Sequence, residues 1–112
     1  MALESLKKKK DFAKVFRKGK AAKESFLFLK ASPNNLTMAR FGIIVSQKVS
    51  KKAVLRNKIR RRIREVLRMR QPEIKGGVDV VISALPGAQG KNFKEIDETI
   101  KNLFIKAKVI KR

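Results

Sequence analysis

The stretch from Lys48 to Arg70 carries the side chains of this chain that are best suited to bind a polyanion. It reads KVSKKAVLRNKIRRRIREVLRMR and holds eleven Lys or Arg residues against a single acid, Glu65. Arginine predominates from Arg56 onward. Its flat guanidinium group presents a fork of N–H donors that matches the oxygens of a phosphate group. The stretch therefore predicts a surface that binds the phosphates of a nucleic acid.

We expect a helix from about Ala53 to Arg70, because apolar and charged residues separate at helical spacing. The apolar face carries Leu55, Ile59, Ile63, Val66 and Leu67 and must enter a core. The opposite face carries Asn57, Arg60, Arg61, Arg64 and Arg68. A helix kept basic only for solubility would mix charge signs, whereas Arg60, Arg64 and Arg68 repel one another at i,i+4 spacing. The pattern favours nucleic-acid binding over a merely solvated face.

The composition excludes most forms of catalysis by protein side chains. The chain has no Cys and no His, which excludes disulfides, thiolate nucleophiles, zinc fingers and hydrolases built on a His base. The only tight group of acids is Glu95, Asp97 and Glu98, at the start of a helical pattern. Acids there are favoured by the helix dipole, and a two-metal nuclease site is the alternative. We expect no catalytic residue and no metal site in the protein.

The length and charge point to one RNA-binding domain spanning residues 1–112, within which residues 1–10 form a basic leader that we expect to be mobile. The net charge of +21 favours an anionic partner. No long apolar segment and no secretory signal is visible, so we expect a cytoplasmic protein that does not bind membranes. No helix-turn-helix spacing precedes the basic helix, which argues against DNA. The protein alone is expected to be a monomer.

Aromatic residues suggest a second site near the start of the chain. In DFAKVFRKG, Phe12, Val15 and Phe16 recur at helical spacing, and Gly19 suits a left-handed helix cap. The two Phe rings either belong to the core or form a platform on which unpaired bases stack. The sequence leaves these alternatives open.

The remaining elements place both sites on an α+β fold. Strands are expected at residues 25–31, 38–46 and 78–84. The first two follow one another across a Pro-Asn turn and are expected to be antiparallel neighbours, and Gly42 in the second suggests a bulge or a close backbone approach. A last helix follows Asn92, which can form a capping box with Glu95. The order is α-β-β-α-β-α, a two-layer α-β sandwich with a βαβ unit, which is normally right-handed.

Several segments resemble the bacterial ribonuclease P protein component. The run Lys51-Lys52-Ala53-Val54-Leu55-Arg56-Asn57, continued by Ile59-Arg60-Arg61 and Ile63-Arg64-Glu65, is similar to the arginine-rich signature of that family. Asp11-Phe12 with Val15-Phe16 and Gly19 resembles its first helix, and Phe41 to Ser46 and Val78 to Val81 resemble two of its strands. The resemblance covers essentially the whole chain in the same order.

This resemblance implies a protein cofactor for a catalytic RNA. In the family, the RNA subunit and its bound Mg²⁺ ions cut the 5′ leader from precursor tRNA, and the protein does not attack the bond. The resemblance also implies a left-handed βαβ crossover in the central sheet. The composition alone also fits a ribosomal or other structural RNA-binding protein, which is the alternative.

The resemblance assigns residues to two surfaces. The surface for the RNA subunit would comprise Lys52, Arg56, Asn57, Arg60, Arg61, Arg64 and Arg68. The surface for the single-stranded leader of precursor tRNA would comprise Phe12, Phe16, Lys48 and either Phe26 or Phe28.

Overall fold

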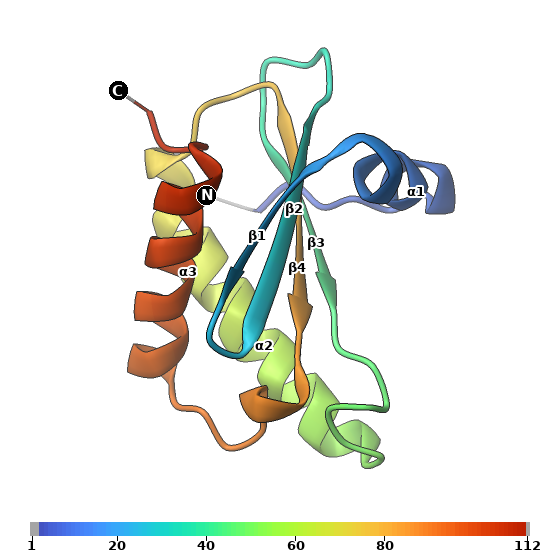
Figure 1. The fold of residues 1–112 in the computed structure, drawn as a ribbon, viewed down its shortest axis with the longest axis vertical. Coiled ribbons are helices and arrows are strands. Elements are labelled where there is room, and N and C mark those ends of the chain that lie inside the picture. The colour runs from blue at the N-terminus through green and yellow to red at the C-terminus, as the bar shows by residue number, and fades with distance from the viewer. Residues whose placement is uncertain (1–2, 112) are drawn as a thin grey trace.

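The computed structural model describes residues 3–111 and shows three α-helices packed around a four-stranded sheet (Figure 1). The elements in chain order are α1 (Lys9–Lys18), β1 (Lys20–Glu24), β2 (Leu27–Pro33), β3 (Arg40–Ile44), α2 (Ala53–Arg70), β4 (Val78–Ala84) and α3 (Phe93–Ala107). Two short 3-10 helices occupy Gln71–Glu73 and Pro86–Ala88. The α+β class and the predicted order are confirmed, with one additional strand, β1.

The sheet has the order β1-β2-β4-β3, so β4 lies between the two strands that we expected to be neighbours. Strand β2 pairs with β4 in antiparallel fashion, and β3 pairs with β4 in parallel. The expectation of a β2–β3 pair is therefore wrong. The reason lies in β4, which reads VDVVISA and is buried at all but one residue. A strand covered on both faces belongs in the middle of a sheet.

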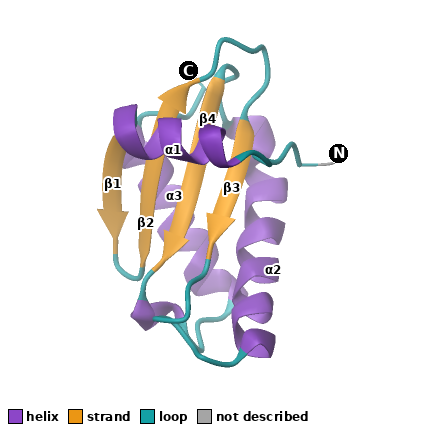
Figure 2. Ribbon diagram, turned by 90° about the vertical axis from the view of Figure 1, so that its right-hand side faces the viewer, coloured by secondary structure: helices purple, strands orange, loops and turns teal. Residues whose placement is uncertain are grey.

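The connection from β3 through α2 to β4 is a left-handed crossover, as the family resemblance implied. Figure 2 views the sheet with α1 in front, and β3 lies to the right of β4 with both strands running downward. Helix α2 returns behind the sheet, as Figure 1 also shows from the side. A path of this kind has the opposite hand to the great majority of parallel crossovers.

Two cores of unequal size lie on the two faces of the sheet. The main core lies between the sheet and helices α2 and α3, where Leu29, Ile63, Ile82 and Leu103 are completely buried. The smaller core lies on the opposite face, where helix α1 crosses the sheet (Figure 2). There Val15 of α1 packs with Val81 of β4 and with Leu6 from the N-terminal segment. Helix α1 is thus fixed to the face that α2 and α3 leave free.

Part of the segment that we expected to be a mobile leader, residues 3–6, is packed against the sheet. Leu3 and Leu6 are buried, and backbone hydrogen bonds of 2.8 and 2.9 Å join Leu6 N–H to the carbonyl of Phe41 and Phe41 N–H to the carbonyl of Glu4. The segment therefore covers part of the exposed edge of β3, which removes unpaired strand groups from solvent. Apolar Leu3 and Leu6, separated by two polar residues, are the sequence feature that this packing uses.

Gly19 ends α1 in an extended conformation, with φ −76° and ψ 151°, and not in the expected left-handed cap. A Cβ atom at Gly19 would lie 2.4 Å from the Val15 carbonyl oxygen and 3.0 Å from that of Ala31. The glycine is needed because the chain turns tightly from α1 into β1, close to β2.

Candidate nucleic-acid interface

Helix α2 presents an arginine face to solvent because its other face is held in the main core. Ile59, Ile63, Val66 and Leu67 are buried as predicted, and Leu55 is half-buried near the start of the helix. The predicted binding residues Lys52, Asn57, Arg61, Arg64 and Arg68 are exposed, whereas Arg56 and Arg60 are half-buried. The structure therefore brings all seven to one helix and its N-cap.

Local hydrogen bonds orient three of these guanidinium groups. Arg56 Nη1 donates to the carbonyl of Ser50 at 2.9 Å, and Arg60 Nη1 donates to Asn57 Oδ1 at 2.6 Å. Arg64 Nη1 reaches Ser5 Oγ at 3.4 Å. Each group keeps N–H donors beyond the one that these bonds use, because a guanidinium carries five. The arginines are positioned and still able to bind phosphate.

The arginine face has few counter-charges of its own. Within residues 3–111, no ion pair involves Arg56, Arg60, Arg61 or Arg64, since the salt bridges of this helix are confined to Arg68 and Arg70. Like charges along one helix destabilise it. A polyanion that binds here would relieve this repulsion, and the affinity would fall with rising salt.

Arg68 differs from the other predicted residues because it forms an ion pair with Glu65, one turn earlier on α2. The hydrogen bond from the guanidinium lowers the pKa of the Glu65 carboxyl below its ordinary value. Both side chains are about half exposed. A phosphate at Arg68 would therefore compete with the Glu65 carboxylate, whereas a phosphate at Arg64 would break no ion pair within the described chain.

Two of the three acids that could have suggested a nuclease site, Asp97 and Glu95, have structural roles. Asp97 pairs with Arg70 at 2.6 Å and joins α3 to α2, and this pair raises the pKa of the Arg70 guanidinium. Glu95 accepts from the Asn92 backbone N–H and forms the predicted capping box. In the described residues, no group of three or more acidic side chains is arranged to hold a metal ion.

A second candidate surface is the half of the sheet that α1 leaves uncovered (Figure 2). One row of cross-strand partners runs across it, formed by Phe28 of β2, Ser83 of β4 and Ile44 of β3. All three are half-buried, and their neighbours in each strand belong to the main core on the opposite face. We call this row, together with Phe16 on α1, the open sheet face.

Phe16, the residue that α1 contributes to the open sheet face, is 38% exposed. The ammonium group of Lys30 on β2 donates to the carbonyl of Phe16 at 2.6 Å and lies 5.9 Å from the centre of its ring. A half-exposed ring with a cation beside it can stack on a base while the cation attracts the backbone. Lys30, Ile44 and Ser83 were not predicted, although the alternation of β2 already placed Lys30 on one face with Phe28.

The other predicted leader-binding residues lie in different settings. Phe26 is in the β1–β2 turn and is 6% exposed within the main core, so it does not face the open sheet face. Of these two residues, Phe28 is the one that lies on the open sheet face. Phe12 is half-buried against the smaller core, and Lys48 is exposed in the loop that follows β3.

The arginine face lies close to Phe12 at the edge of β3. A small cavity of about 190 Å³ is lined by Arg60 and Arg64 from α2, by Phe12 from α1 and by Ile43 from β3. Two arginines of α2 and Phe12 of α1 therefore meet at this edge, whereas the residues of the open sheet face are not among the described residues that line the cavity. No helix within residues 3–111 is both long and apolar enough to cross a membrane.

Comparisons with known proteins agree on one family. The sequence model of the family described as Ribonuclease P matches residues 2–108. The chain is 39% identical over 106 residues to the "Ribonuclease P protein component" of Pseudanabaena sp., which covers 94% of this chain and 91% of that relative. It is 42% identical over 99 residues to the protein of the same name from Clostridioides difficile, with coverage of 88% and 86%.

Solved structures show the same fold. The RNase P protein of Staphylococcus aureus superposes with a TM-score of 0.88 at 29% identity, covering 98% of this chain and 100% of that one. The RNase P protein from Thermotoga maritima superposes with a TM-score of 0.81 at 29% identity, covering 89% of this chain and 94% of that one.

Proposed function

This chain belongs to the ribonuclease P protein family, and we propose that it serves that enzyme by binding two RNAs on two different surfaces. The family is the protein subunit of an endoribonuclease complex that matures the 5′ end of tRNA. One RNA is the catalytic subunit, and the other is the 5′ leader of precursor tRNA. The observation that carries the proposal is the separation of an unpaired arginine face from a half-exposed aromatic face within one small protein.

The arginine face of α2 binds the RNA subunit. Arg56, Arg60, Arg61 and Arg64 supply guanidinium groups without ion-pair partners in the described chain, which suits the phosphate backbone of a large folded RNA. Asn57, Lys52 and Arg68 extend the same face. Contacts of this kind position the protein on the RNA and read little sequence.

The open sheet face binds the single-stranded leader. Phe28 and Phe16 offer rings on which bases stack, worth about 1 to 3 kcal/mol per base, and stacking does not choose among bases. Lys30 and Lys48 attract the leader backbone. Tolerance of many leader sequences follows from this chemistry, and a subunit that serves many precursor tRNAs needs it.

The protein contributes no catalytic group in this proposal. In the described chain no group of three or more acidic side chains is arranged to hold a metal ion, and we assign no catalytic role to these carboxylates. Mg²⁺ ions held by RNA phosphates supply the chemistry of phosphodiester hydrolysis. The protein lowers the repulsion between two RNAs, and the complex should therefore need less Mg²⁺ than the RNA alone.

The decisive experiment measures cleavage of a 5′-labelled precursor tRNA at low Mg²⁺ with the protein alone, bacterial ribonuclease P RNA alone, and both together. Activity only in the mixture supports the proposal. Cleavage by the protein alone would contradict the absence of a catalytic group. A mixture no more active than the RNA alone would favour the alternative, a ribosomal or other structural RNA-binding protein. We further propose that residues 1–112 act as a single, monomeric RNA-binding domain in the cytoplasm.

A further inference from the structure

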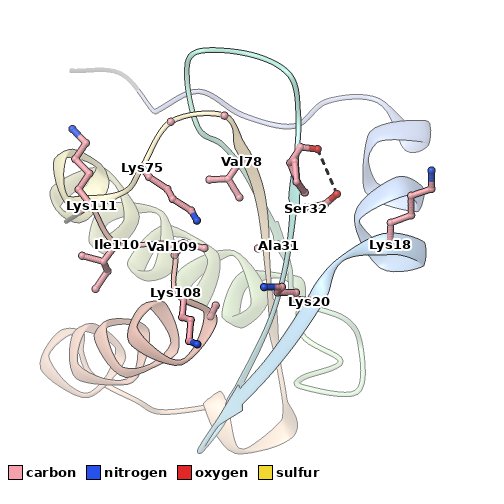
Figure 3. A pocket seen from close by; sticks show the side chains of 14 residues that line it. Lys18, Lys20, Ala31, Ser32, Lys75, Val78, Lys108, Val109, Ile110 and Lys111 are labelled. Carbon is pink, nitrogen blue, oxygen red and sulfur yellow. Dashed lines mark hydrogen bonds between the residues drawn. The ribbon is translucent and has the colours of Figure 1, made fainter.

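A large pocket lies at the end of the sheet where α3 ends, away from the cavity between α2 and β3. Its volume is about 800 Å³, within the usual range of ligand pockets. It is formed where the start of β1, the end of β2, the turn before β4 and the segment after α3 come together (Figure 3). Neither surface of the proposed function includes any of its residues.

Lysine side chains surround this pocket. The ammonium groups of Lys20 and Lys75 extend toward the hollow, Lys108 lines it from the end of α3, and Lys18 and Lys111 point away from it (Figure 3). No acidic residue is among those of the described chain that line the pocket, and within residues 3–111 none of the three ammonium groups takes part in an ion pair. Three like charges around one hollow favour an anion.

The backbone that carries two of these lysines is held in place. Lys75 N–H donates to the carbonyl of Val109 at 2.9 Å, which joins the turn before β4 to the segment after α3. Lys108 has the left-handed conformation, with φ 57°, that ends α3. The backbone at Gly76, the residue after Lys75, is packed tightly against the chain at Thr37, because a Cβ atom at Gly76 would lie 2.1 Å from the Thr37 carbonyl oxygen. The pocket is therefore a fixed frame with flexible cationic side chains.

The floor of the pocket is apolar. Ala31, Val78, Val109 and Ile110 line it between the lysines. A simple inorganic anion would gain nothing from such a floor, whereas a nucleotide places its phosphate at the ammonium groups and its ribose or base against the aliphatic side chains. Lysine suits this task because its compact charge attracts a phosphate from many directions.

We propose that this lysine pocket is a third RNA-binding site, which holds the phosphate and an adjoining nucleoside of one RNA segment. The choice of RNA among possible anions rests on the proposed function. The segment belongs either to the RNA subunit or to the precursor tRNA, and both offer the same phosphodiester chemistry. The site would let the protein hold RNA at both ends of its sheet.

The test compares charge-neutral double variants of the full chain. Lys75→Gln with Lys108→Gln removes two cations of the pocket, and Lys94→Gln with Lys101→Gln removes two exposed cations from α3 as a matched control. Lys75→Arg with Lys108→Arg keeps the charge. Affinity for the RNA subunit, for precursor tRNA and for mature tRNA is measured between 50 and 400 mM salt, after thermal unfolding shows that all variants are folded.

We expect the pocket variant to lower the salt dependence of binding to one of these RNAs by about 1 to 2 units of slope, and the arginine variant to retain it. A lowered salt dependence of binding to the RNA subunit identifies that subunit as the source of the segment. If the salt dependence is lowered only for precursor tRNA, the segment belongs to the leader. If it is lowered equally for precursor and mature tRNA, the segment belongs to the tRNA body. If the pocket variant matches the α3 control for every RNA, the third site does not exist. Failure of the proposed function would instead appear as weak binding by the unaltered protein.

Discussion

The ring of Phe12 lies directly on Gly42, so closely that a Cβ atom at Gly42 would come within 2.4 Å of Phe12 Cε1. The sheet register is regular at this point, since Gly42 pairs with Val81. Of the two explanations that the sequence offered for this glycine, a close approach is therefore the correct one. The contact seats helix α1 on the sheet and so determines how much of the sheet face stays open.

Gly42→Ala should destabilise the protein by roughly 1 to 3 kcal/mol, because the added methyl group must displace the Phe12 ring and with it α1. Urea unfolding followed by circular dichroism measures the change. Gly87→Ala is the matched control, since its Cβ atom would lie 3.5 Å from Phe26 Cβ, an ordinary contact. Equal stability of the two variants would show that α1 is not anchored through this glycine.

Phe28→Ala should weaken binding of precursor tRNA by about 1 to 3 kcal/mol while leaving mature tRNA unaffected, because the ring would stack on leader bases only. Phe26→Ala should behave differently, since that ring is buried in the main core. We expect it to lower the free energy of unfolding by roughly 3 to 5 kcal/mol without a preference for the leader. Titration of the assembled complex with both tRNAs distinguishes the two variants. A leader-selective effect of Phe26→Ala would contradict our placement of the site.

Arg64→Ala should weaken binding of the RNA subunit and reduce the salt slope by about one unit, because one phosphate contact is lost. Stability should hardly change, since Arg64 is exposed and its side chain reaches only Ser5 at 3.4 Å. Filter binding at several salt concentrations checks this, with Lys94→Ala on the outer side of α3 as the control. An identical slope for both variants would remove Arg64 from the interface.

Glu65→Gln should strengthen binding of the RNA subunit, because it frees Arg68 from its ion pair and removes a negative charge from the arginine face. The pKa of Glu65 is lowered by Arg68, so the carboxylate stays ionised throughout the neutral range and only substitution releases the pair there. The pair's contribution to stability is present above the ordinary carboxyl pKa of about 4.3 and is lost as the pH falls through the lowered value. For Glu65→Gln, we expect the salt dependence of binding to the RNA subunit to be steeper by up to about one unit of slope. Unchanged or weaker binding would show that Arg68 does not contact RNA.

The sequence was most informative where two patterns agreed. The apolar and basic residues of α2 both follow helical spacing, and the predicted range, from Ala53 to Arg70, matches the helix observed. The start of α3 was predictable because Asn92 and Glu95 form their capping box locally. Strand β4, which reads VDVVISA, was recognisable because it is rich in Val and Ile. In each of these cases, the information lies within a few turns or residues of the chain.

Features that depend on distant segments could not be predicted in this way. Strand β1 reads KAAKE and has no buried residue, so only its pairing with β2 makes it a strand. The burial of Phe26 follows from the turn that precedes β2, in which Ser25 has φ 53°, and a turn of unknown type leaves the facing of the next residues open. The lysine pocket brings together Lys20, Lys75 and Lys108, which lie far apart in the sequence.

The handedness of the β3–α2–β4 connection determines whether the arginine face and the open sheet face lie on opposite sides of the sheet. A right-handed connection would carry α2 across to the face that α1 occupies, and its bulk would bury the row of Phe28, Ser83 and Ile44. The left-handed path leaves that row half-buried and not covered by α2, and it places the arginines of α2 on the opposite face of the sheet. In the function that we propose, the RNA subunit and the precursor tRNA would therefore bind at the same time without competing for one surface, and loss of one binding surface would leave the other intact.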